Sequence, residues 1–149
     1  MKKKAILPPT YFYSALIISL ILNYVFPIFK FIPFPVNLFG IVLIIFGVVL
    51  NLKTDKMFKE ANTTVKPFQV PTALLTHGPF SWCRHPMYLG MIAILFGVSM
   101  ICGSLTCFAG PLIFWIVIRI KFIGAEEQSM LNTFGEEYIR YKDRVKSWV

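Results

Sequence analysis

Charged side chains are scarce in this chain of 149 residues, and acidic ones are the scarcer kind, with seven against 15 lysines and arginines. Only 15% of the residues are charged, whereas 56% are hydrophobic. An ordinary soluble domain has about a quarter charged residues, so this composition argues against one. The three cysteines are odd in number and lack metal-ligand spacing. The sequence therefore predicts neither a disulfide framework nor a metal site.

Long apolar runs are what the sequence has instead. A membrane-spanning helix needs about 20 apolar residues, and the segment 87–123 is long enough for two short spans. The turn between those two is expected at Gly103-Ser104, with Gly110-Pro111 as an alternative break. We predict an all-α integral membrane protein, a single domain over 1–149 with about four transmembrane helices. The predicted spans are 11–29, 36–52, 87–102 and 105–121.

The basic residues predict the orientation of these spans. Lys2–Lys4, the polar segment 53–84 and the tail fall on one side of the membrane, and only Lys30 falls on the other. The positive-inside rule then places both termini in the cytoplasm of a multi-pass protein. Orientation and contact with anionic membrane lipids account for the net charge of +8, so we expect no nucleic-acid partner.

The tail changes character after the last span. Tyr138, Tyr141 and Val145 form an apolar stripe opposite basic and acidic side chains, and Gly135 is a candidate break. This pattern is typical of an amphipathic helix at a membrane surface. We predict a cytosolic amphipathic C-terminal helix at about 125–146.

A first candidate site is Arg84-His85-Pro86-x-Tyr88, at the start of the third predicted span. Pro86 suits the first turn of a helix, which leaves His85 at the cap and exposes backbone N–H groups to an anion. Interfacial anchoring by Arg84 and the neighbouring aromatic residues explains the same pattern. Residue spacing favours neither interpretation.

A second candidate is the pair Glu126-Glu127, directly after the last span. Adjacent helical carboxylates point about 100° apart, so we expect one to face the bundle and the other to face water. Two glutamates in the first turn of a tail helix also suit the helix dipole, and the pair alone favours that structural role. The proline-containing loop 65–80 is expected to pack on the protein, with His77 as a polar loop residue.

Together these segments resemble the isoprenylcysteine carboxyl methyltransferase and phospholipid methyltransferase superfamily of integral membrane enzymes. The resemblance covers about Val65 to Val145 and includes an apolar hairpin. Its motifs are Leu74-Leu75-Thr76-x-Gly78-x-Phe80, Arg84-His85-Pro86-x-Tyr88-x-Gly90, Glu126-Glu127 and Phe134-Gly135-Glu136-Glu137-Tyr138-x-x-Tyr141.

The resemblance implies S-adenosylmethionine as the methyl donor and no metal. It implies catalytic roles for Arg84, His85 and Glu126, and places Glu126 and Glu127 toward the methyl acceptor. The residues that it assigns to the cofactor are Leu74, Leu75, Phe80, His85, Pro86, Met87 and Tyr88.

Phe122 departs from the pattern of the prenylcysteine enzymes, which place an arginine one helical turn before the first glutamate. Lysine does not reproduce the two-point capture of a carboxylate by arginine, so the nearby Lys121 is no substitute. An amine or another lipid headgroup therefore fits the acceptor position at least as well as a prenylcysteine carboxylate.

The leading hypothesis is S-adenosylmethionine-dependent methyl transfer to a small lipidic or amphiphilic acceptor at the cytosolic membrane face. One alternative is an NADPH-dependent membrane reductase of the sterol reductase type, because such reductases have a similar carboxy-terminal pattern. A non-catalytic membrane subunit is the other. The sequence predicts no particular oligomeric state.

Overall fold

The computed structural model describes residues 7–63 and 70–148. Within those ranges the regular secondary structure is helical, apart from one isolated bridge between Lys30 and Ser104. The predicted cytoplasmic lysines Lys2–Lys4 and the start of the 65–80 loop lie outside the described residues.

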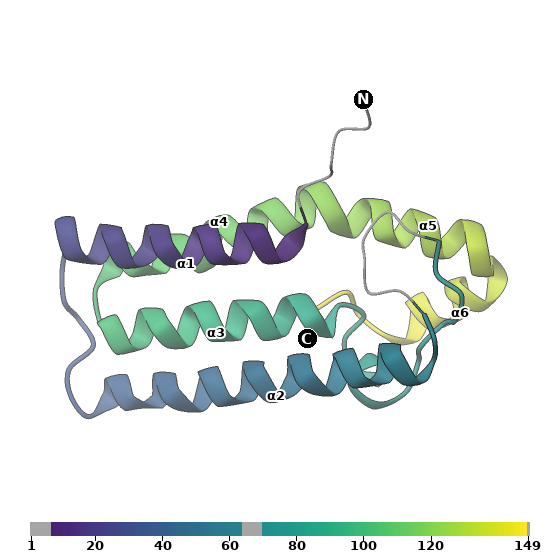
Figure 1. Ribbon diagram of the computed structural model, residues 1–149, viewed down its shortest axis with the longest axis horizontal. Helices are drawn as coiled ribbons and strands as arrows, with labels where there is room; N and C mark the ends of the chain where they lie inside the picture. Colours follow the sequence, from purple (N-terminus) through teal and green to yellow (C-terminus); the bar gives the residue numbers. More distant parts are fainter. Residues whose placement is uncertain (1–6, 64–69, 149) are drawn as a thin grey trace.

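Four helices lie lengthwise beside one another, with α3 between α2 and the α1–α4 pair (Figure 1). Both short turns, α1–α2 and α3–α4, lie at one end of this bundle. The connection from α2 to α3, together with α5 and α6, lies at the other end. The long helices are α1 (Pro8–Val25), α2 (Phe39–Glu60), α3 (Pro86–Cys102), α4 (Ala109–Ile118), α5 (Gly124–Phe134) and α6 (Glu136–Arg144). The short ones are η1 (Val36–Leu38), η2 (Gly78–Ser81), η3 (Leu105–Phe108) and the π-helical η4 (Arg119–Ile123).

Two helical stretches, Val36–Glu60 and Leu105–Phe134, are long and apolar enough to cross a membrane. They contain the second and fourth predicted spans. The third, α3, is a shorter apolar helix of 17 residues. The all-helical prediction is confirmed for the described residues, whereas the count of four spans remains a prediction.

The observed helix ends differ from the predicted ones for local reasons. α1 already begins at Pro8, because proline is favoured in the first turn of a helix. α2 continues past Leu52 to Glu60, and the ion pair between Lys56 and Glu60, at 3.6 Å, supports this polar extension. The predicted turn at Gly103 is confirmed, with φ at 70°. The alternative break at Gly110-Pro111 is wrong, since both residues lie inside α4.

The predicted tail helix is two helices. Gly135, with φ at 49°, separates α5 from α6, as its candidate role as a break suggested. α5 is moreover continuous with α4 through η4. Glu126 and Glu127 are therefore not at a free helix N-terminus, and the helix-dipole interpretation of this pair is wrong.

Glycines bring α2 and α3 into close contact. A Cβ atom on Gly47 would overlap the carbonyl oxygen of Gly90, and one on Gly40 would overlap that of Gly97. Small residues at such interfaces let the backbones of membrane helices approach closely. This contact fixes the end of α2 relative to the start of α3, which is where the candidate site lies.

Replacing Gly47 by alanine is expected to lower the melting temperature in detergent. The methyl group would push the two backbones apart, and overpacking of this kind costs about 1–3 kcal/mol. Gly124→Ala is the matched control, because a Cβ there meets nothing within 4 Å. That control should leave stability equal or raise it. Equal melting temperatures for the two variants would show that the α2–α3 contact is looser than described.

Candidate active site

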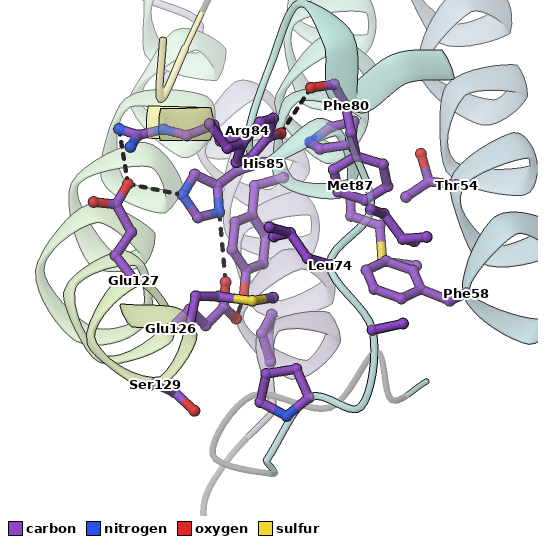
Figure 2. A pocket seen from close by; sticks show the side chains of 18 of the residues that line it. Thr54, Phe58, Leu74, Phe80, Arg84, His85, Met87, Glu126, Glu127 and Ser129 are labelled. Atoms are coloured by element: carbon purple, nitrogen blue, oxygen red, sulfur yellow. Dashed lines mark hydrogen bonds and ion pairs between the residues drawn. The ribbon is translucent and has the colours of Figure 1, made fainter. Parts of the chain in front are cut away.

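A cavity of about 330 Å³ lies at the bundle end where α5, α6 and the α2–α3 connection meet (Figure 2). Its wall is mainly apolar, with a group of charged side chains on one side. The structure brings all the predicted site residues to this wall. They are Leu74, Leu75, Phe80, Arg84, His85, Pro86, Met87, Tyr88, Glu126 and Glu127.

The start of α3 places His85 in this wall. Pro86 occupies the first helical position and His85 is the N-cap residue, as the sequence predicted. The backbone before it is held by the tail, because the N–H of Arg84 donates to the carbonyl of Lys146 at 3.1 Å. Trp148 lies next to the imidazole, with 6.4 Å between the ring centroids.

Both glutamates face His85 from α5 (Figure 2). Glu127 lies 3.3 Å from His85 Nε2, and Glu126 lies 3.5 Å from His85 Nδ1. The expectation that one glutamate faces water is therefore wrong. The two side chains point in different directions, but each contacts a different ring nitrogen of His85. Tyr88 also donates its hydroxyl hydrogen bond to Glu126.

Glu127 is the centre of an ion-pair cluster. Arg84 Nη2 lies 2.9 Å from one of its carboxylate oxygens, and Lys142 Nζ of α6 lies 3.3 Å from the other. The Arg84 side chain is only 9% exposed. Its Nε and Nη1 are buried without a hydrogen-bond partner in the described structure. The cluster therefore offers buried donors at the cavity wall.

These contacts shift two pKa values. Burial raises the pKa of Glu127, but the hydrogen bond with His85 and the charges of Arg84 and Lys142 outweigh it and lower the pKa from 4.5 to about 2. Burial lowers the pKa of His85, but the hydrogen bonds and charges of Glu126 and Glu127 outweigh it and raise the pKa above 6.5. His85 is thus biased toward the imidazolium form.

The shifts predict that this cluster stabilises the fold most between pH 4.5 and 6.5. The contribution of Glu127, whose folded pKa is lowered, is complete above pH 4.5 and disappears as the pH falls toward 2. That of His85, whose pKa is raised, is complete below pH 6.5 and is lost as the pH rises through the folded pKa. In wild type, the melting temperature should therefore fall both below pH 4.5 and above pH 6.5. Both decreases should be smaller in Glu127→Gln. The exposed control Glu60→Gln should keep the wild-type profile.

The apolar side of the cavity comes from segments distant in sequence. Phe80 packs edge-on against Phe58 of α2, and its carbonyl accepts a 2.7 Å hydrogen bond from the hydroxyl of Tyr141. The loop residues Leu74 and Leu75 lie in the same wall. This side has the shape and chemistry for a flat, partly apolar group.

Several wall residues were missed by the sequence analysis. Tyr138 and Tyr141 were predicted to lie on the apolar stripe of the tail, but that stripe gave no sign that it lines a cavity. Thr54 and Phe58 lie in the part of α2 that the sequence analysis placed in the polar segment 53–84, outside the second predicted span. The residues missed are Leu7, Pro8, Pro9, Thr54, Phe58, Pro71, Ala73, Met91, Ser129, Met130, Tyr138 and Tyr141.

Phe122, which replaces an expected arginine, is buried and lies with its ring 5.7 Å from that of Tyr11. Lys121 is directed to the Tyr11 hydroxyl, at 3.2 Å, and Arg119 stacks over Trp115. Neither side chain lines the cavity. Phe122 does not line the cavity either, so none of these three residues places a charge in its wall.

The chain is similar to known proteins in sequence and in fold. The profile of the phospholipid methyltransferase family matches residues 36–137. The mouse protein-S-isoprenylcysteine O-methyltransferase is 33% identical over 111 residues, which are 71% of this chain and 38% of the mouse protein. A probable protein of the same name from Oryza sativa subsp. indica is 30% identical, over 75% of this chain and 60% of that one. This chain belongs to the isoprenylcysteine carboxyl methyltransferase and phospholipid methyltransferase superfamily.

A solved structure supports the same assignment. The eukaryotic intramembrane Ras methyltransferase, an isoprenylcysteine carboxyl methyltransferase, superposes with a TM-score of 0.67 at 26% identity. The match covers 95% of this chain and 51% of that one. This chain thus spans about half the length of the solved relative, and less than half of the mouse protein. These three relatives are named as methyltransferases, which does not favour the reductase alternative.

Proposed function

We propose that this protein transfers a methyl group from S-adenosylmethionine to a small lipidic or amphiphilic acceptor at the cytosolic face of a membrane. One observation carries the proposal. The residues that the family resemblance assigns to the cofactor and the acceptor, although distant in sequence, line one cavity. Its volume of about 330 Å³ lies within the range of small-molecule sites.

The residues present fit the proposed cofactor. Leu74, Leu75 and Phe80 offer an apolar wall for an adenosine group. Arg84 has buried donors without partners, which suit a carboxylate such as that of an amino-acid group. When bound, S-adenosylmethionine supplies an electrophilic methyl group on a sulfonium centre. The aromatic ring of Tyr88 and the carboxylate of Glu126 suit a nearby cation.

Glu126 is the residue we assign to the acceptor. An amine acceptor must lose a proton in the course of methylation, and a carboxylate in contact with it takes that proton as a general base. His85 and Tyr88 hold the Glu126 side chain in position. Phe122 stands where the prenylcysteine enzymes have an arginine that suits a carboxylate, and this replacement favours an amine or a neutral headgroup as the acceptor.

The proposed membrane placement follows from the bundle. We propose a single domain of four spans, α1, α2, α3 and α4, with the cavity end in the cytoplasm, together with both termini. The polar part of α2, the helices α5 and α6, and the charged side of the cavity share that end (Figure 1). A site at this interface is open to a water-soluble cofactor and to a lipidic acceptor.

Ligand binding tests the cofactor. The detergent-purified protein should melt at a higher temperature with S-adenosylhomocysteine or S-adenosylmethionine, and at an unchanged temperature with NADPH. Binding to the native state alone stabilises by about 2.7 kcal/mol at a hundredfold excess over Kd. A shift with NADPH alone would instead support the reductase alternative. A folded protein that binds none of the three would fit the non-catalytic subunit.

A further inference from the structure

The connection between α1 and α2 lies at the end of the bundle opposite α5 and α6 (Figure 1). It exposes a group of aromatic side chains. They lie on residues 24–39, which we call the aromatic turn, from the last turn of α1 to the first residue of α2. Lys30 is the only charged residue between positions 5 and 52. An exposed apolar surface of this kind marks a contact site. The most exposed of its side chains are Tyr24 at 88%, Phe26 at 62%, Phe29 at 75%, Phe34 at 78% and Phe39 at 65%.

Part of the backbone of the aromatic turn is hydrogen-bonded within the protein. Pro27, Pro33 and Pro35 have no N–H group. The N–H groups of Phe31 and Ile32 both donate to the carbonyl of Gly103, at 3.0 and 3.4 Å. The N–H groups of Phe26, Ile28, Asn37 and Leu38 also donate to backbone carbonyls. An unpaired N–H is costly in lipid but not in water, so these hydrogen bonds lower the cost of placing this part of the backbone in an apolar environment.

Three polar side chains beside the aromatic turn are paired with one another. Ser104, which is fully buried, donates to the side-chain oxygen of Asn23 at 2.6 Å and lies 2.9 Å from the hydroxyl of Thr106. Phe31 packs against Phe108 of η3, with 5.7 Å between the ring centroids. Apart from Lys30 and Asn37, the surface left outside is aromatic and aliphatic, and it is continuous with the apolar outer faces of α1 and α2.

The length of α3 also favours a position of the aromatic turn within the membrane. Its 17 residues rise about 25 Å at 1.5 Å per residue, which is shorter than a bilayer core of about 30 Å. With its N-terminus at the cytosolic headgroups, its other end and the neighbouring aromatic turn would lie below the opposite headgroups. Lysine side chains reach several ångströms toward an interface, so Lys30 can remain in contact with phosphate.

We propose that the aromatic turn is immersed in the membrane, and that its partner is the lipid of the non-cytosolic leaflet, at the boundary between acyl chains and headgroups. This inference rests on the membrane placement proposed above and does not depend on methyl transfer. It implies that the protein offers little surface to water on that side of the membrane, and that acceptor and cofactor enter from the other side.

Tryptophan fluorescence tests the proposal by comparing probes at the two ends of α2. Trp82, Trp115 and Trp148 are replaced by phenylalanine, and single tryptophans are introduced as Phe39→Trp and Lys59→Trp, at opposite ends of α2. Phe26→Trp is a second probe of the aromatic turn, and a variant that keeps Trp115 alone reports a mid-span position. Each is reconstituted into phosphatidylcholine vesicles with acyl chains brominated at defined depths, and is also titrated with iodide.

The proposal predicts strong quenching by brominated lipid at positions 39 and 26, as at Trp115, with iodide quenching several-fold weaker than at position 59. Iodide quenching at position 39 equal to that at position 59 would overturn it. Protection of positions 39 and 26 from both quenchers would also overturn it, by showing that protein covers the turn. A Trp115 that brominated lipid does not quench would refute the membrane placement itself, while adenosyl-ligand binding would still test the proposed activity separately.

Discussion

Glu126→Gln is expected to reduce methyl transfer by about 10²- to 10⁴-fold, the range that a general base contributes. The amide keeps the size of the carboxylate and still accepts the hydrogen bond from Tyr88, so the cavity should keep its shape. It no longer takes a proton from the acceptor. Binding of S-adenosylhomocysteine should change by no more than a few-fold, as measured by calorimetry on the same preparation.

The exposed Glu136, at the start of α6, provides a matched control for that variant. Glu136→Gln removes the same charge outside the cavity and should leave both the rate and the affinity unchanged. If Glu126→Gln retains the wild-type rate, the acceptor needs no proton removed, and the assignment of Glu126 as base is wrong.

Arg84→Ala should have the largest effect on stability, because it removes a cation that is 9% exposed and leaves Glu127, 16% exposed, without its closest partner. Loss of one member of a buried ion pair costs about 3–5 kcal/mol. His85 and Lys142 remain near Glu127, so we expect the lower end of that range. Binding of S-adenosylhomocysteine should weaken at least tenfold, because the cavity loses its buried donors.

A second change separates the two roles of Arg84. The double variant Arg84→Ala, Glu127→Gln leaves no uncompensated carboxylate and should recover part of the lost free energy of unfolding, as measured by denaturant titration. It should not recover ligand binding. A double variant that is less stable than Arg84→Ala would mean that Glu127 is stabilised mainly by other groups. Arg140→Ala, at an exposed position of α6, is the control for removal of an arginine.

The sequence predicted the features that depend on local patterns. The apolar runs predicted the long helices, and Gly103 predicted the turn between α3 and α4. Pro86 predicted that His85 lies at the start of α3. The end of α2 was missed because polar residues after Leu52 indicated a loop. Oppositely charged residues four positions apart, such as Lys56 and Glu60, were the sequence signal that could have predicted a longer helix.

The parts that sequence patterns missed depend on contacts between distant segments. The hydrogen bond from Tyr141 to the carbonyl of Phe80 joins residues 61 apart and closes the apolar side of the cavity. The convergence of Glu126 and Glu127 on His85 depends on the unbroken passage from α4 through η4 into α5. Local spacing carries no information about such an approach, so it predicted one glutamate in water.

A direct measurement of methyl transfer is the decisive test of the proposed activity. The protein in lipid vesicles is supplied with S-adenosylmethionine labelled on its methyl group, and label is counted in the organic extract against Glu126→Gln as the inactive reference. We predict label in an extractable lipid product, with amine-headed amphiphiles more effective than prenylcysteine carboxylates. No label in any lipid, from a folded protein that binds S-adenosylhomocysteine, would contradict the proposed lipidic acceptor. Equal labelling by Glu126→Gln would contradict the proposed site.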